Sequence, residues 1–309
     1  MSIASSPVAV RRVGVIGTGA MGGGVVKSLV RAGVTTYARD IRAQAQAAAV
    51  ADGATGTATP AELARACDAV VLLVVDAAQI DTVLFGAEGA VAALAPDSIV
   101  VASSTVDPGF AAELAPRLAQ HRVLLLDAPV SGGPAKAADG TMTMMVAGDP
   151  GALDRARPVL AAITGKLFVV GPRAGDASAL KIVNNLLAGA NLAAAAEAMT
   201  IAIRAGLDPQ QVYDVINASS GGSWIFTDRM TRALAGDYAP RAATRILTKD
   251  VSIAAAFAAR LGVDAPFART AHAAFADAVD GGYGDEDDAS IVKRTADRAG
   301  VSAPGAKKR

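Results

Sequence analysis

Short apolar runs separated by polar and glycine-rich stretches recur along the first half of the chain. The runs VGVI and AVVLLVV are examples, and neither alternates between apolar and polar residues. Strands of a parallel sheet have this continuous apolar character because both of their faces are buried. Helical patterns lie between most of the runs, which favours a sheet covered by helices on both faces. The predicted strands are residues 13–16, 34–38, 69–75, 99–102, 123–126 and 143–146.

The pattern changes near Gly171. From Ala177 onward apolar residues recur at helical spacing, and no convincing strand follows. The predicted helices are residues 177–205, 209–218, 223–235, 247–261, 266–279 and 286–298. We therefore predict an α/β protein with a Rossmann-type, doubly wound, mainly parallel sheet in residues 1–174. An all-α domain follows in residues 175–309, joined to the first by a long interdomain helix, and residues 296–309 form a polar, basic tail that we expect to fray.

One stretch, Leu186–Ile203, is almost wholly apolar and approaches the length of about 20 residues that a membrane span needs. It is rich in alanine and contains Glu197, so we interpret it as a helix buried inside the protein. The N-terminus lacks a basic segment followed by an apolar one, so no secretory signal is expected. These observations predict a protein that does not bind or span a membrane and that lies in a reducing compartment, the cytoplasm.

The composition argues against several other classes of function. Basic and acidic residues balance at 29 each, which leaves no basic surface for nucleic acid. The single cysteine, Cys67, excludes an internal disulfide and a cysteine metal cluster. His121 and His272 lie far apart and lack the spacing of a zinc site, so no metal is predicted.

The segment GTGAMG follows the first predicted strand and opens the first predicted helix. Its GxGxxG spacing suits a dinucleotide, because Gly17 allows a tight turn and Gly19 lets the backbone approach a pyrophosphate. The helix N-terminus then offers free N–H groups to the phosphates. A purely structural glycine turn is the alternative. The predicted cradle consists of Gly17, Thr18, Gly19, Ala20, Met21 and Gly22.

Asp40 follows the second predicted strand and lies 18 residues after Gly22. A carboxylate at this place accepts hydrogen bonds from the adenosine ribose and repels a 2′-phosphate, which favours NAD over NADP. Arg39 and Arg42 weaken this preference, because either guanidinium could pair with a phosphate.

The segment DAPVSGG also follows a predicted strand. Ligands of a dinucleotide-binding sheet lie at the carboxyl ends of its strands. Two glycines there expose backbone N–H groups without Cβ atoms in the way, and Ser131 adds a hydroxyl donor. We therefore expect Ser131, Gly132 and Gly133 to bind the carboxylate of a substrate, with an ordinary tight turn as the alternative.

Lys181 and Asn185 lie four residues apart in the first part of the long predicted helix and so share one face of it. An unpaired ammonium group is costly to bury, so a lysine in so apolar a helix needs a partner or a function. Desolvation lowers the pKa of a lysine, which would let Lys181 act as an acid or base toward a hydroxyl group. The alternative is a lysine whose head reaches solvent at the end of the helix.

Together these motifs resemble the β-hydroxyacid dehydrogenase family, whose members oxidise or reduce short hydroxy acids with a nicotinamide cofactor. The resemblance covers about residues 12–295. It rests on GTGAMG at 17–22, SST at 103–105, DAPVSGG at 127–133, KIVNN at 181–185 and KD at 249–250. It implies a small hydroxy-acid substrate, NAD as the cofactor, and a homodimer or homotetramer.

The resemblance also implies a role for individual residues. Lys181 is the catalytic acid/base and Asn185 its substrate-binding neighbour, while Ser131, Gly132 and Gly133 hold the substrate carboxylate.

Four further residues belong to the cofactor site by the same resemblance. Thr105 lies near the nicotinamide side, Val75 lines the path of the adenosine ribose, and Lys249 reaches the cofactor from the helical domain. Asp250 orders Lys249 by an ion pair, with a solvated pair on the helix surface as the alternative.

A narrower set of runs is similar to the L-threonate dehydrogenases, a subgroup that oxidises L-threonate at C2 to 2-dehydro-L-erythronate with NAD. These runs are LVVDAAQIDTVLFG (73–86), SGGPAKAADGTMTMM (131–145), SWIFTDRM (223–230), GDYAPRAA (236–243) and GYGDEDDAS (282–290). Trp224 and Phe226 could then shape the substrate pocket, with core packing as the alternative. Other open readings are a family member acting on 3-hydroxyisobutyrate, 4-hydroxybutyrate or glycerate and tartronate semialdehyde, and a nicotinamide-binding sensor without turnover.

Overall fold

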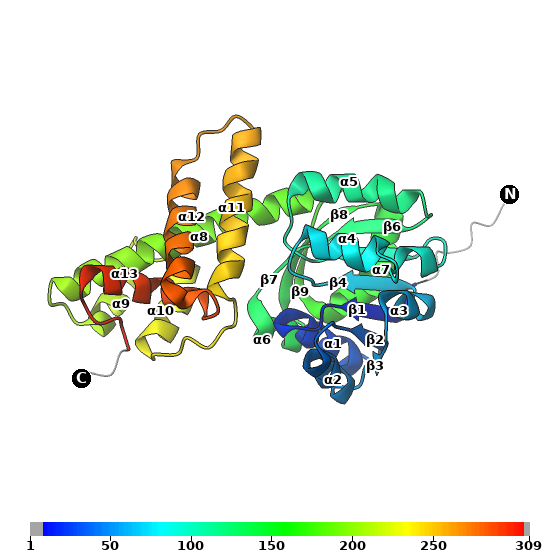
Figure 1. The fold of residues 1–309 in the computed structure, drawn as a ribbon, viewed down its shortest axis with the longest axis horizontal. Helices are drawn as coiled ribbons and strands as arrows, with labels where there is room; N and C mark the ends of the chain where they lie inside the picture. The colour runs from blue at the N-terminus through cyan, green and yellow to red at the C-terminus, as the bar shows by residue number, and fades with distance from the viewer. Residues whose placement is uncertain (1–8, 306–309) are drawn as a thin grey trace. The chain divides into compact units, whose positions relative to one another are not determined.

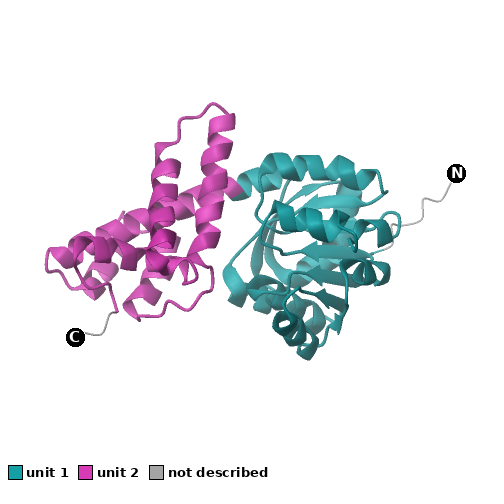
Figure 2. Cartoon of the chain, in the orientation of Figure 1, with its two compact units in different colours: residues 1–181 teal, residues 182–309 magenta. Residues whose placement is uncertain are grey.

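The computed structural model describes residues 9–305. The chain divides into two compact units, unit 1 (Met1–Lys181) and unit 2 (Ile182–Arg309), which Figure 2 shows in different colours. The division falls inside helix α8 (Asp176–Arg204), and the predicted domain boundary between residues 174 and 175 stays a prediction. Two terminal segments lie outside the described residues. They are residues 1–8, which belong to the N-terminal stretch for which no secretory signal is expected, and residues 306–309 of the predicted tail.

Unit 1 is built on one sheet, whose strands run in the order β3-β2-β1-β4-β5-β6-β8-β7, with β9 also paired to β8 (Figure 1). Neighbours from β3 to β6 are parallel, whereas β8 runs antiparallel to β6 and β7 and parallel to β9. The strands are β1 (Arg12–Ile16), β2 (Thr35–Arg39), β3 (Thr55–Gly56), β4 (Ala69–Leu72), β5 (Ile99–Ala102), β6 (Leu124–Asp127), β7 (Val130–Ser131), β8 (Met142–Gly148) and β9 (Thr164–Gly171).

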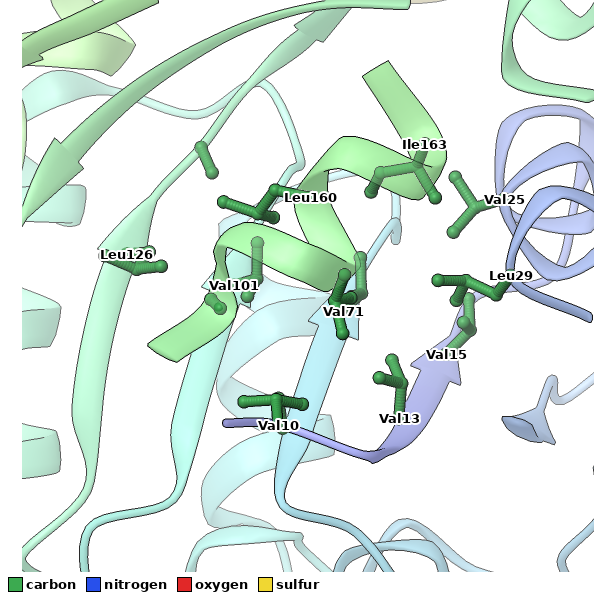
Figure 3. Close-up of a cluster of buried hydrophobic side chains, with 14 of the residues drawn as sticks. Val10, Val13, Val15, Val25, Leu29, Val71, Val101, Leu126, Leu160 and Ile163 are labelled. Atoms are coloured by element: carbon green, nitrogen blue, oxygen red, sulfur yellow. The ribbon is translucent and has the colours of Figure 1, made fainter. Parts of the chain in front are cut away.

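Helices cover both faces of this sheet. Successive strand residues point to opposite sides, and because both sets are apolar, both faces need a covering layer. Val71 and Val101 pack with α1 and α7 in the apolar cluster of Figure 3, whereas Val70 and Val100 pack with α3, α4 and α5. The predicted doubly wound, mainly parallel sheet is confirmed. The helices of unit 1 are α1 (Ala20–Arg31), α2 (Ala43–Ala51), α3 (Pro60–Ala66), α4 (Ala77–Phe85), the 3-10 turn η1 (Val91–Ala93), α5 (Pro108–Ala119), α6 (Gly133–Asp139) and α7 (Pro150–Ile163).

The strands differ from the prediction in two respects. The run to Val75 was expected to stay in the sheet, but β4 ends at Leu72 because its neighbour β1 gives way to the glycine loop after Ile16. Three strands were not predicted. Of these, β3 and β7 have two residues each, too few to make a pattern, and β9 exposes Phe168 and Val169, so it lacks the burial expected of a central strand.

Unit 2 is helical. Within residues 182–305 the structure has no β-strand, and its one β-type pairing is an isolated bridge between Ala243 and Asp287. Its core includes the fully buried Phe275, and Gly189 lets α8 approach α11 so closely that a Cβ atom there would lie 2.3 Å from Val251 Cγ1. The all-α prediction is confirmed. Besides α8 the elements are α9 (Pro209–Asn217), α10 (Trp224–Leu234), α11 (Thr244–Arg260), α12 (Pro266–Ala278), the π-helical turn η2 (Val279–Tyr283), the 3-10 turn η3 (Asp288–Ser290) and α13 (Ile291–Ala299).

Helix α8 is long and apolar enough, by length and composition alone, to cross a membrane, with a mean hydropathy of 1.6 over its most apolar window. Core helices of soluble proteins pass the same test, so the finding is weak evidence. Leu192, Ala196 and Met199 of α8 are buried in the core of unit 2.

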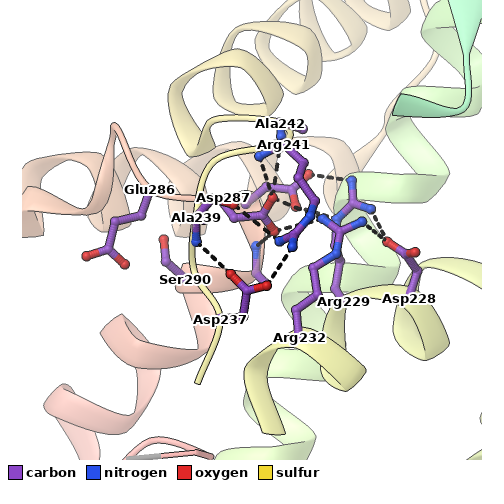
Figure 4. Close-up of polar contacts among 12 residues, drawn as sticks. Asp228, Arg229, Arg232, Asp237, Ala239, Arg241, Ala242, Glu286, Asp287 and Ser290 are labelled. Atoms are coloured by element: carbon purple, nitrogen blue, oxygen red, sulfur yellow. Dashed lines mark hydrogen bonds and ion pairs between the residues drawn. The ribbon is translucent and has the colours of Figure 1, made fainter. Parts of the chain in front are cut away.

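A network of charged side chains ties α10 to the segment around η3 (Figure 4). Arg229 binds both Asp228 and Asp288, and its Nη2 lies 3.0 Å from Asp288 Oδ2. Arg232 Nη1 lies 3.0 Å from Oδ2 of Asp287, which is fully buried. Burial raises the pKa of Asp288, and the guanidinium of Arg229 opposes this shift. The buried carboxylates therefore depend on their arginines to remain charged.

We predict that Asp288→Ala lowers the free energy of unfolding by about 3 kcal/mol, because Arg229 then keeps a largely buried and undercompensated charge. Urea unfolding followed by circular dichroism measures the change. Asp264→Ala is the control, since Asp264 pairs with Arg269 at the surface and its loss should change little. Equal losses in the two variants would show that burial of the pair is unimportant.

Candidate active site

The glycine cradle joins the end of β1 to the start of α1. Gly17 has a φ of +89°, and a Cβ atom on it would lie 2.7 Å from the carbonyl oxygen of Leu73. A Cβ on Gly22 would lie 1.9 Å from the carbonyl oxygen of Gly17. Only glycine fits at these positions, so the first turn of α1 packs directly on the loop. The cradle lies at the carboxyl end of β1, where the strand order reverses between β1 and β4, the usual place for a dinucleotide.

Two buried hydroxyl groups beside the carboxyl ends of the strands have no hydrogen-bond partner among the described residues. They are Thr18 Oγ1 in the cradle and Ser103 Oγ, directly after β5. An unsatisfied buried hydroxyl costs about 1–3 kcal/mol, so such groups suit a ligand that supplies polar atoms. The tight glycine loop and these hydroxyls together fit a bound dinucleotide.

Asp40 follows β2 and its carboxylate is buried against the cradle. Its Oδ2 accepts a hydrogen bond from the backbone N–H of Thr18 at 2.8 Å, and its Oδ1 accepts one from Arg42 Nε at 3.1 Å. Burial acts to raise the pKa of Asp40, but the hydrogen bonds and charge of Arg42 outweigh it, so the pKa lies below its usual value. Asp40 is therefore ionised and holds the loop. A Cβ on Gly19 would lie 2.8 Å from Arg42 Nη2, so the guanidinium also lies beside the cradle.

The other two unit 1 residues predicted at the cofactor lie after neighbouring strands. Val75 follows β4, is 45% exposed, and its backbone N–H donates to Gln79 Oε1 at 2.9 Å. Thr105 follows β5 and is partly buried. The strands β1, β4 and β5 are adjacent and parallel, so their carboxyl ends lie at the same edge of the sheet. Val75 and Thr105 therefore come after strand ends at the edge where the cradle also lies.

The Ser131 loop leads from β7 into α6. Gly132 and Gly133 have φ values of +134° and +76°, which explains why two glycines are needed. A Cβ on Gly133 would meet no atom within 4 Å, so its backbone borders open space. Helix α6 packs on α1, where Ser28 Oγ donates to the carbonyl oxygen of Ala137 at 2.7 Å. The loop is thus attached to the same helix that begins at the cradle.

Lys181 and Asn185 lie one turn apart in α8, and both are buried, at 7% and 6% exposure. Within unit 2, Asn185 Nδ2 donates to Asp250 Oδ2 at 2.7 Å. Lys249 Nζ donates to the other oxygen of Asp250, also at 2.7 Å. Both side chains of this ion pair are mostly buried, so it is not a solvated surface pair. One buried carboxylate therefore binds a residue predicted to contact substrate and a residue predicted to contact the cofactor.

Asp127 is a candidate that the sequence interpretation passed over. It ends β6, is 1% exposed, and accepts hydrogen bonds from the first turn of α8. The available signal was a carboxylate at the end of an apolar run, without any indication of its partner.

The two aromatic residues at the start of α10 differ in their surroundings. Phe226 is buried and stacks on Tyr213 with ring centroids 5.8 Å apart, whereas Trp224 is 63% exposed.

Comparison with known proteins assigns the chain to a family. A model described as the NAD binding domain of 6-phosphogluconate dehydrogenase matches residues 12–171, and one described as NAD-binding of NADP-dependent 3-hydroxyisobutyrate dehydrogenase matches residues 175–295. The chain belongs to the β-hydroxyacid dehydrogenase family. The predicted family is thereby confirmed. The prediction that the chain is an NAD-dependent dehydrogenase acting on a hydroxy acid is confirmed as well.

Individual β-hydroxyacid dehydrogenases are similar over nearly the whole chain. L-Threonate dehydrogenase of Cupriavidus necator is 47% identical over 295 residues, which cover 96% of this chain and 98% of that protein. L-Threonate dehydrogenase of Escherichia coli K12 is 43% identical over 96% of this chain and 97% of its own length. The crystal structure of 3-hydroxyisobutyrate dehydrogenase from Salmonella typhimurium matches with a TM-score of 0.86 at 42% identity, covering 91% of this chain and 99% of its own.

We predict that Gly22→Ala weakens NAD binding by about tenfold or more, because its Cβ would displace the loop at Gly17. Titration with NADH, followed by its fluorescence, measures the affinity. Gly23→Ala is the matched control one position further along α1, where a Cβ would lie 3.3 Å from the nearest atom, the carbonyl oxygen of Thr18. Unchanged NADH affinity in Gly22→Ala would remove the cradle from the cofactor site.

We also predict that Asp40→Ser shifts the cofactor preference toward NADP. The substitution removes the carboxylate that would accept the ribose hydroxyls and frees the Arg42 guanidinium for a 2′-phosphate. The ratio of kcat/KM for NADP to that for NAD should rise by about tenfold or more. Arg42→Ala added to Asp40→Ser should cancel the gain with NADP, and a gain that persists would contradict the role of Arg42.

Proposed function

We propose that this β-hydroxyacid dehydrogenase oxidises L-threonate at C2 to 2-dehydro-L-erythronate with NAD. The observation that carries the proposal is the similarity, along nearly the whole chain, to two proteins named L-threonate dehydrogenase. The buried Lys181, one helical turn before Asn185, supplies the chemistry that such an oxidation needs.

In the proposed mechanism Lys181 is the base. Its neutral amine accepts the proton of the C2 hydroxyl, which Asn185 also binds. The N–H groups of Gly132 and Gly133 and the hydroxyl of Ser131 hold the substrate carboxylate and so fix the position of C2. Bound NAD would supply the hydride acceptor for the hydrogen on C2.

The cofactor-binding residues of the proposal are those predicted from the sequence. The cradle residues Gly17 to Gly22 hold the pyrophosphate, and Asp40 binds the adenosine ribose. Thr105 and Val75 complete the site in unit 1. The family resemblance also assigns Lys249 to the cofactor, and Asp250 binds its ammonium group.

The oligomeric state and location belong to the same proposal. We expect a homodimer or homotetramer in the cytoplasm. Helix α8 supports an oligomer, because it exposes a stripe of large apolar side chains that a second subunit could cover: Leu180, Val183, Leu187 and Ile201. A reducing location agrees with Cys67, a lone buried thiol whose pKa burial raises to about 12.

A second candidate substrate is 3-hydroxyisobutyrate. The similar Salmonella structure and the family model for residues 175–295 both carry that name. Glycerate and tartronate semialdehyde belong to the same class of short acids. A sensor that binds NAD without turnover is the remaining alternative.

We predict that NAD reduction by the purified protein is fastest with L-threonate in a panel that includes D-threonate, D-erythronate, glycerate and 3-hydroxyisobutyrate. The change in absorbance of NADH measures each kcat/KM. Faster turnover of another acid would replace the substrate and keep the reaction class. Binding of NAD without reduction by any of these acids would favour the sensor.

In the same assay Lys181→Ala should lower kcat by about 100-fold or more, because the general base is lost, while NAD still binds at the cradle. Lys166→Ala is the control, since Lys166 lies on the exposed strand β9. A near-normal rate in Lys181→Ala would remove this lysine from the mechanism.

A further inference from the structure

The first turn of α8 has no capping side chain of its own. Gly175 directly precedes the helix, has a φ of +97°, and a Cβ there would lie 2.7 Å from the carbonyl oxygen of Pro108. Glycine is therefore required at this position, and it has no side-chain oxygen to accept from the free N–H groups of the turn that follows.

Asp127 supplies that oxygen from a different element, 48 residues earlier in the chain. Its Oδ2 accepts hydrogen bonds from the N–H groups of Gly175 at 2.8 Å and Ser178 at 2.9 Å. Its Oδ1 accepts one from Ser178 Oγ at 2.6 Å. Burial raises the pKa of Asp127, and the hydrogen bonds from Ser178 and Gly175 oppose this shift, as does the positive end of the helix dipole at which the carboxylate lies.

The backbone of Asp127 is held just as firmly. Residue 127 is paired with Ala102 of β5 on one side and Ala147 of β8 on the other. Ala177, in the first turn of α8, packs against Met145 and Ala147 of β8.

The same strand segment leads into the Ser131 loop. Ser131 follows Asp127 by four residues, and the two strands β7 and β8 pair Ser131 with Thr143. Lys181 follows Ser178 by three residues, within the next turn of α8. Asp127 thus connects the segment that carries the carboxylate-binding loop to the helix turn that carries the base.

We infer that Asp127 is a positioning residue for the dehydrogenase reaction, which fixes the start of α8, and with it Lys181, relative to the Ser131 loop. This inference rests on the proposed role of Lys181. Asp127 itself contacts neither substrate nor cofactor in the proposed mechanism. Its effect is on the geometry of proton transfer, where a displacement of about 1 Å is costly.

The test is Asp127→Asn in the full-length protein. The amide can still accept hydrogen bonds but loses the charge and offers an NH₂ group where Ser178 Oγ donates. We expect kcat with the best acid of the panel to fall by about 100-fold. The affinity for NADH should stay unchanged, because the cradle lies on another loop. Asp149→Asn is the matched control, since Asp149 also caps a helix of unit 1, α7, by accepting from Ala152 N at 2.8 Å.

A double-mutant cycle separates positioning from a general loss of structure. If Asp127 acts through Lys181, Asp127→Asn should lower kcat much less in the Lys181→Ala background than in the parent protein. An equal loss in both backgrounds would overturn the inference, and so would a normal kcat in Asp127→Asn alone. Should Asp127→Asn fail to fold, Ser178→Ala removes one of the three hydrogen bonds and keeps the carboxylate. A normal kcat in Ser178→Ala would then count against positioning, and a reduced kcat that disappears in the Lys181→Ala background would support it.

The single variant Lys181→Ala keeps the two proposals distinct. If it turns over normally, the proposed mechanism fails, and the inference about Asp127 fails with it. If Lys181→Ala is inactive while Asp127→Asn is fully active, only the positioning inference fails.

Discussion

The carboxylate of Asp127 joins the two parts of unit 1 on which the proposed chemistry depends. It ends a central strand and accepts three hydrogen bonds at the start of α8. A helix whose first turn contains a glycine at its cap position would otherwise leave N–H groups unsatisfied in a buried place. Supplying the cap from the sheet fixes the helix axis where it begins, which is also where Lys181 lies.

The glycine cradle is fixed by a different physical cause, which is steric exclusion. Gly17 and Gly22 leave no room for a Cβ atom, so the loop and the first turn of α1 pack closely against each other. The buried carboxylate of Asp40 adds a hydrogen bond, which it accepts from the N–H of Thr18. This packing and the hydrogen bond together hold the cradle, which lowers the conformational cost of binding a dinucleotide.

The parts that could be predicted from the sequence are those with local signals. Continuous apolar runs predicted β1, β4, β5 and β6, because buried parallel strands need both faces apolar. Helical spacing predicted α8 to α12. Signals of this kind fail for β7, which is only two residues long, and for β9, whose Phe168 and Val169 are exposed.

For the site, residues in local motifs such as GTGAMG could be proposed from the sequence. Contacts between distant residues could not, since the bond between Asn185 and Asp250 spans 65 residues and that between Ser178 and Asp127 spans 51. Pairings at such separations follow from the fold and leave no spacing in the sequence.

Asp250 has a consequence for how this enzyme can diverge. Its two carboxylate oxygens are divided between Asn185 and Lys249, one to each. A substitution of Lys249 that retunes cofactor binding would release one oxygen and leave the buried charge of Asp250 to find another donor. The Asn185 amide would still donate to the other oxygen, but the carboxylate that holds it would have lost its opposing ammonium group. In the proposed roles, cofactor binding by Lys249 and binding of the substrate hydroxyl by Asn185 both depend on the negative charge of Asp250. Selection on one of these properties therefore constrains the other.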